Sequence, residues 1–265
     1  MKYDCSDIKR AYKNIGISRG MTISLKTDLR FLGPFDDSTF DLLSAHYNIL
    51  ADLVDLSEGT IVVSTATFSL CNTSKVFDIA NTPSEMGALT EYIRTKPESV
   101  RSLHPFASHT AIGKNANYIC SNVARHSYGP DTPKARLLEL DAQYLSIGMP
   151  PSKITMTIHQ IERLMGVPYR YVKEFIQPIL RENEIVYEPF YLDVRYLECN
   201  ARMDLNNKVY PNFFKCGYKV KEEVLGRGKI YSFSMYEFYL STIQLLKNDL
   251  YACLASEPPE KPFQT

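Results

Sequence analysis

The chain has 265 residues, of which 45% are hydrophobic, so it can bury a large core. Its 30 basic and 30 acidic residues give zero formal net charge at pH 7, which argues against a nucleic-acid partner, because such proteins carry a basic excess. No apolar run approaches the ~18 residues of a membrane span, and no signal-peptide pattern is seen, so we expect a cytoplasmic protein without a membrane partner.

The six cysteines are scattered along the chain, and no two of them form a C-x-x-C pair. Zinc sites and disulfide frameworks are usually recognisable from such spacings. We therefore expect reduced thiols and no bound metal ion.

Periodic apolar residues predict alternating helices and strands through the first two thirds of the chain. In chain order we expect a helix over 8–15, a strand over 21–29, a helix over 40–54, a strand over 60–68, a helix over 83–96, a strand over 109–112, helices over 116–125 and from 132, a strand over 143–149 and a helix over 157–166. This alternation predicts an α/β fold, here a layered α/β core.

After residue 168 the pattern changes. Strands over 169–178 and 185–196 would form a hairpin around a polar turn, followed by a strand over 226–232 and a long helix from Ser234 to about residue 254. We see no linker or repeat, so we expect one domain over 1–265. Its α/β core over 1–168 carries the motifs, and residues 169–265 form an elaborated C-terminal half.

The first candidate site begins at Thr82, which fits a capping box with Glu85 and would start a helix with free N–H groups. On that helix Ser84 and Glu91 would share one face, about two turns or roughly 10 Å apart. An active-site role for this pair is favoured over a helix-start hydroxyl and a solvated carboxylate.

A basic and polar stretch follows this helix, with Arg101, Ser102 and a His-Pro turn at His104. Together with the helix start it suits an anionic or acyl ligand. Arg101 and Ser102 could bind phosphates or could equally brace the loop, and His104 is favoured as a residue that ties loops together.

The sharpest catalytic candidate is His159. Thr157 and Gln160 fit a capping box, so His159 would lie in the first helical turn, where the helix dipole disfavours imidazolium and leaves a neutral base near pH 7. Glu162, three residues later, could orient the ring. The alternative is a hydrogen-bonded histidine without a chemical role.

Both regions resemble the aminoglycoside 3-N-acetyltransferase family. The family signature "TPS-x-MGAL…R…RS-x-HP-x-x-S-x-x-A-x-G" is matched by residues 82–89, Arg94, residues 101–105, Ser108, Ala111 and Gly113, and its "T-x-H-x-x-E" element by Thr157, His159 and Glu162. The resemblance covers roughly residues 15–200. It implies a three-layer α/β/α sandwich and not the GNAT fold, whose Q/R-x-x-G-x-G/A loop is missing.

The resemblance implies transfer of an acyl group from a coenzyme A thioester, the co-substrate, to an amine without a metal. It implies that His159 is the general base and that Ser84 or Thr157, with helix-start N–H groups, stabilises the oxyanion. If His159 is not the general base, the next candidates are the carboxylates of Glu91 and Asp193. The residues expected to bind acyl-CoA are Lys26, Thr27, Arg101, Ser102, His104 and Ser108.

The chain departs from the family pattern at three places. Residues 26–29 replace a "V-H-x-S-L" run, Ser64 replaces a proline, and residues 190–193 keep only part of an acidic "F-E-x-x-D" element. Aminoglycosides are polycations and need acidic pockets. The departures therefore favour an amino sugar attached to a nucleotide, such as the dTDP-linked sugar of the anthrose pathway.

Two alternatives stay open for the function. One is a true aminoglycoside 3-N-acetyltransferase that confers antibiotic resistance, and the other is a non-catalytic acyl-CoA-binding module. Intact His159 and Glu162 favour an enzyme. Whether the chain forms a homo-oligomer is left open.

Overall fold

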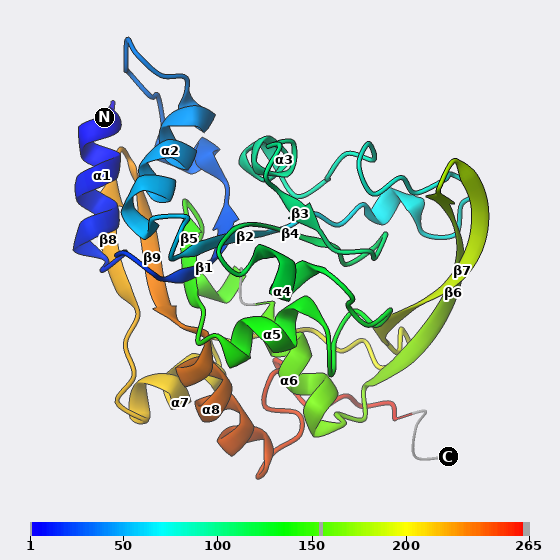
Figure 1. Cartoon of the computed structure of the whole chain (residues 1–265). Coiled ribbons are helices and arrows are strands. Elements are labelled where there is room, and N and C mark those ends of the chain that lie inside the picture. Colours follow the sequence, from blue (N-terminus) through cyan, green and yellow to red (C-terminus); the bar gives the residue numbers. More distant parts are fainter. Residues whose placement is uncertain (1, 154–155, 262–265) are drawn as a thin grey trace.

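The computed structural model describes residues 2–153 and 156–261 (Figure 1). Its centre is a seven-stranded mixed sheet in the order β3-β4-β2-β1-β5-β9-β8. In this sheet β1 is parallel to β2 and β5, whereas the outer strands pair antiparallel. The strands are β1 (Thr22–Thr27), β2 (Thr60–Ser64), β3 (Val100–Arg101), β4 (His109–Gly113), β5 (Gln143–Ile147), β8 (Lys221–Leu225) and β9 (Gly228–Ser234).

Helices cover both faces of this sheet. Because neighbouring strand residues point to opposite faces, Ile61 belongs to one buried core and Val62 to the other. The first core packs under α1 (Cys5–Asn14), α2 (Leu42–Val54) and α3 (Ala88–Arg94). The second packs under α4 (Ala116–Cys120), α5 (Pro133–Glu139), α6 (Thr157–Met165), α7 (Val209–Lys215) and α8 (Met235–Leu246). The expected three-layer α/β/α fold is confirmed.

Several predicted boundaries follow from local signals. Thr132 caps α5 by accepting a hydrogen bond from Ala135, with a proline in the first turn. Ser234 caps α8 in the same way. Gly166 ends α6 in the left-handed conformation, with φ +61°, which glycine adopts without steric cost.

The predicted helix over 83–96 is wrong in its first turn. The Thr82 hydroxyl accepts a hydrogen bond from an N–H four residues earlier, and the Glu85 carboxylate accepts one from Ser69, so the two do not form a capping box. Gly87, at φ +115°, then turns the chain into α3. The Thr82 hydroxyl and the Glu85 carboxylate therefore bind N–H groups elsewhere in the fold and do not cap a helix.

The predicted C-terminal hairpin is confirmed and is longer than expected. Strands β6 (Arg170–Arg181) and β7 (Glu184–Arg195) pair antiparallel along their whole length. The two turn residues, Glu182 and Asn183, have φ values of +48° and +70°, as a tight hairpin turn with matching twist requires. The two-stranded ribbon curves away from the main sheet, and the end where β6 begins lies beside α6 (Figure 1).

The other C-terminal elements differ more from the prediction. Strand β8 and helix α7 were not predicted, and α4 and α8 are shorter than expected. Strands β9 and β8 extend the same sheet beyond β5, while the division at residue 168 stays a prediction. Within residues 2–153 and 156–261, no helix has the length and apolar character of a bilayer span.

Candidate active site

A cavity of about 450 Å³ opens where β1 and β2 end. Lys26 of β1 and Ser64 of β2 line it from the sheet, beside His109, which pairs in register with Ser64. His159 of α6 and Asp193 of β7 also line it. The remaining walls are mostly apolar: Ala66, Phe68, Met86, Phe106, Ala107, Met156, Leu192 and Val194. The tertiary structure therefore brings together two residues that the sequence assigned to catalysis, His159 and Asp193.

The His159 ring is held by a buried carboxylate. Its Nδ1 lies 2.7 Å from Oε2 of Glu162, whose side chain is fully buried. A carboxylate only accepts hydrogen bonds, so it favours the tautomer with hydrogen on Nδ1 and leaves the Nε2 lone pair free to accept a proton. Nη2 of Arg170 also lies 2.9 Å from Nδ1 and competes with Glu162 for this atom, and Tyr128 contacts the ring edge to face at 5.5 Å.

Glu162 is held in turn by two further residues. Its Oε1 accepts a hydrogen bond of 2.7 Å from the Tyr169 hydroxyl, and Nε of Arg170 forms an ion pair with Oε2 at 2.6 Å. Burial alone would raise the Glu162 pKa, but the hydrogen bond from His159 and the charges of His159 and Arg170 outweigh it and lower the pKa. The carboxylate therefore stays ionised and can stabilise an imidazolium.

The predicted capping box of this helix is wrong, although His159 does lie in the first turn of α6. Gln160 instead exchanges two hydrogen bonds with the backbone of Gly129, at 2.7 and 3.2 Å. The hydroxyl of Thr157 contacts the Tyr144 hydroxyl, which also accepts a 2.8 Å bond from the Thr157 N–H. Thr157 is fully buried, so these contacts give no support to its predicted oxyanion role.

Asp193 of β7 is the other predicted catalytic residue that lines this cavity. Its Oδ2 accepts a hydrogen bond of 3.0 Å from Ser127, and its Oδ1 is 3.5 Å from Nη1 of Arg163. Burial raises the Asp193 pKa. A carboxylate in such a setting can hold an amine in the cavity or accept a proton.

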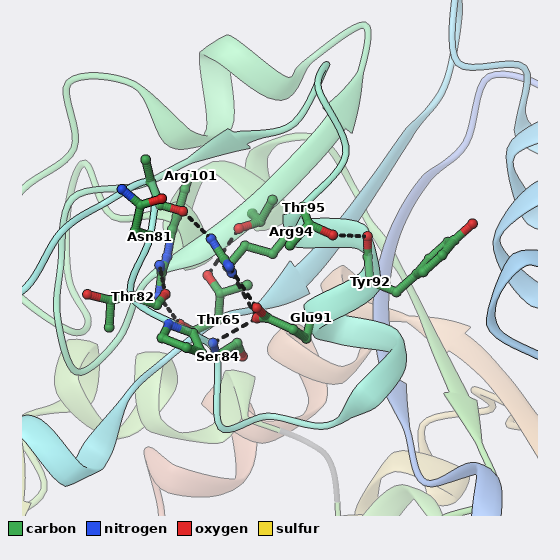
Figure 2. Close-up of polar contacts among 12 residues, drawn as sticks. Thr65, Asn81, Thr82, Ser84, Glu91, Tyr92, Arg94, Thr95 and Arg101 are labelled. Carbon is green, nitrogen blue, oxygen red and sulfur yellow. Dashed lines mark hydrogen bonds and ion pairs between the residues drawn. The ribbon is translucent and has the colours of Figure 1, made fainter.

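Ser84 and Glu91 lie together, but not on a common helix face (Figure 2). The Glu91 carboxylate accepts a 2.8 Å hydrogen bond from the Ser84 N–H and forms an ion pair of 2.6 Å with Arg94. The hydrogen bond from Arg94 lowers the Glu91 pKa. Neither residue lines the cavity of His159, so their catalytic role stays a prediction without support from these contacts.

Arg101 braces three loops. Its guanidinium donates hydrogen bonds to the carbonyl oxygens of Thr65 (2.7 Å), Thr82 (2.6 Å) and Ile79 (3.2 Å), and to the Ser108 hydroxyl at 3.3 Å (Figure 2). Burial, with the charge of a neighbouring arginine, lowers its pKa to about 10. Of the two open alternatives, the geometry favours the brace over a phosphate contact.

The other residues expected to bind acyl-CoA are mostly buried supports. The Ser102 hydroxyl accepts a 2.8 Å hydrogen bond from the His109 N–H, and Nδ1 of His104 accepts one of 3.1 Å from Ala107. Burial lowers the His104 pKa to about 4, so its ring is neutral. Thr27 is on the sheet face opposite to its neighbour Lys26. Coenzyme A binding by these residues stays a prediction.

Two cavity residues were missed by the sequence reasoning. Arg170 follows α6 at the start of β6, and Lys134 is the second residue of α5, 2% exposed. Neither belongs to a motif, and only the fold brings them to the cavity of His159. Within the described ranges, no three His, Cys, Asp or Glu side chains are grouped so that they could hold a metal ion.

Arg101→Met is expected to lower the free energy of unfolding by about 3 kcal/mol, because three carbonyl oxygens lose a donor at ~1 kcal/mol each. Denaturant titration measures this loss. Arg19→Met is the control, since that side chain is 66% exposed and surface ion pairs contribute about 0–1 kcal/mol. A stable Arg101→Met protein with a raised KM for acyl-CoA would instead support the phosphate-binding alternative.

The fold and the site define a layered α/β protein with a histidine–carboxylate pair at a cavity. The sequence matches the family described as aminoglycoside 3-N-acetyltransferase over residues 26–247, and the chain belongs to this family. The family resemblance expected from the motifs is thereby confirmed, whereas nothing supports the anthrose-pathway comparison specifically.

Individual relatives carry the same description. Aminoglycoside N(3)-acetyltransferase VII of Streptomyces paromomycinus is 35% identical over 106 residues, which are 40% of this chain and 36% of that protein. Aminoglycoside N(3)-acetyltransferase III of Pseudomonas aeruginosa is 34% identical over 39% of this chain and 38% of its own length. These matched segments therefore span less than half of either relative.

Solved structures show the same fold over nearly the whole chain. Aminoglycoside acetyltransferase AAC(3)-Xa has a TM-score of 0.78 at 19% identity and covers 94% of both chains. The structure described as AAC-IIIb binary with CoASH has a TM-score of 0.77 at 17% identity, over 93% of this chain and 97% of that one. At these identities the likeness shows the fold alone.

Proposed function

We propose that this protein is an N-acyltransferase that moves an acyl group from a coenzyme A thioester to an amine, with His159 as the general base. The observation that carries the proposal is the 2.7 Å contact between the buried Glu162 carboxylate and Nδ1 of His159, a residue that lines the cavity. Family membership supports the reaction type, and a structure with the same fold is described as bound to CoASH.

In the proposed reaction the amine attacks the thioester carbonyl, so that a C–N bond forms as the C–S bond breaks. Nε2 of His159 takes the proton that the amine loses, and Glu162 stabilises the imidazolium. The proton then passes to the departing thiolate, which leaves as free coenzyme A. The apolar walls, such as Phe106 and Leu192, limit water in the cavity and so limit hydrolysis of the thioester.

Two classes of molecule are candidates for the acceptor, and both carry an amine on an amino sugar. The names of the relatives make an aminoglycoside the first to test. The dTDP-linked amino sugar is the second, and the observation that favours it is the presence of Lys26 and Lys134 in the cavity, where a polycation would be repelled.

A turnover assay tests the proposal. Acetyl-CoA is incubated with the protein and with gentamicin, kanamycin or a nucleotide-linked amino sugar, and free thiol is measured. We expect thiol release that requires the amine. Acyl-CoA binding without release for any amine would indicate the binding module instead, and comparable kcat/KM on an aminoglycoside would exclude a preference for the nucleotide sugar.

A further inference from the structure

The cavity beside His159 contains two lysines that the proposed reaction does not use. Lys26 pairs in register with Ser146 of the neighbouring strand β5. It lines the cavity with His109 from the sheet, while Lys134 reaches the cavity from α5. Basic side chains therefore line the cavity from both the sheet and α5.

Neither lysine has an acidic partner among the described residues. No hydrogen bond or ion pair joins Lys26 or Lys134 to any described residue, and Nζ of Lys134 has only the Tyr144 ring, 5.9 Å away. Lys134 is 2% exposed. Burial, and then the charge of Lys26, lowers its pKa to about 7, and burial lowers that of Lys26 to about 8.

The acidic residues of the site are already engaged. Glu162 is paired with His159 and Arg170, and Asp193 lies beside Arg163. Neutral His109 adds an Nε2 atom without a partner, since burial and the two lysine charges lower its pKa well below the ordinary value. Two lysine amines without acidic partners in one cavity fit an anionic ligand, because a nearby negative charge would favour their charged form.

We propose that Lys26 and Lys134 bind an anionic group, a carboxylate or a phosphate, carried by the amine acceptor. The acceptor amine must come within hydrogen-bond reach of His159, and both lysines line that same cavity. The phosphates of coenzyme A are separated from the thioester by the long pantetheine arm. The assignment to the acceptor rests on the proposed function, whereas the anion site itself does not.

Calorimetry with inorganic phosphate tests the site directly. The native protein should bind phosphate, and Lys26→Met and Lys134→Met should each weaken binding about 10- to 100-fold, as expected for loss of one charge-assisted hydrogen bond. Methionine fills the volume of the lysine stem, so both variants should fold, which thermal unfolding checks. Lys9→Met, on an exposed face of α1, should bind like the native protein.

Phosphate that does not bind the native protein, or that binds both methionine variants as tightly as Lys9→Met, would overturn the anion site. A second phosphate titration, of the native protein in the presence of saturating coenzyme A, tests whether the site belongs to the acceptor. If coenzyme A leaves the phosphate affinity unchanged, the lysines are free to bind a group of the acceptor. If coenzyme A prevents phosphate from binding, the lysines bind coenzyme A itself, and the proposal is overturned. These readouts require no turnover, so absence of thiol release would count against the proposed function and leave the anion site standing.

Discussion

His159→Asn is expected to lower kcat and kcat/KM by about 10²–10⁴-fold, the range for a lost general base. Asparagine can still donate toward Glu162, which lies 2.7 Å from Nδ1 of the native ring, but it has no nitrogen that takes up a proton near neutral pH. Folding and acyl-CoA binding should remain. Steady-state thiol release measures the first effect, and calorimetry with acyl-CoA measures the second.

His46→Asn is the matched control. His46 is fully buried under the opposite sheet face, where its ring contacts the hydroxyls of Tyr12 and Tyr3. This change should lower thermal stability and leave kcat per folded molecule nearly intact. A folded His159→Asn protein that keeps more than about a tenth of native kcat lies outside the general-base range, and the base would then have to be sought at Asp193.

Glu162→Gln is expected to lower the free energy of unfolding by about 3–5 kcal/mol, because removing one partner of a buried ion pair leaves the other charge uncompensated. That charge is Arg170, whose side chain is only 10% exposed. The variant should also lower kcat, since the His159 ring loses the carboxylate that orients it and stabilises its imidazolium form. Denaturant titration and thiol release measure the two effects.

The pH dependence of this stability has a definite sign. The folded-state pKa of Glu162 lies below its ordinary value of 4.5. The carboxylate therefore stabilises the fold above that value, and its contribution is lost as the pH falls toward the lowered pKa. The native protein and Glu162→Gln should therefore differ less and less in free energy of unfolding as the pH falls below 4.5. Glu98→Gln, an exposed control, should follow the native curve, and a difference that grows with acid would contradict the assignment.

Features that depend on neighbouring residues could be predicted from the sequence. Apolar spacing gave the alternation of helices and strands, and the polar turn gave the hairpin at Glu182 and Asn183. The pairing of His159 with Glu162 was also predictable, because residues three apart on a helix lie on neighbouring parts of one face. Such contacts need no information from distant parts of the chain.

Only the tertiary structure decided the charge of the cavity and the role of the motif loop. Arg170 contacts His159 and Lys134 lines the same cavity because β6 and α5 fold against α6 and the sheet, and no local pattern marks them. Arg101 could have bound a phosphate, but loop carbonyl oxygens far from it in sequence take its hydrogen bonds. A hydrogen-bonding group binds whichever partner the fold supplies, so its role is decided only when distant segments meet.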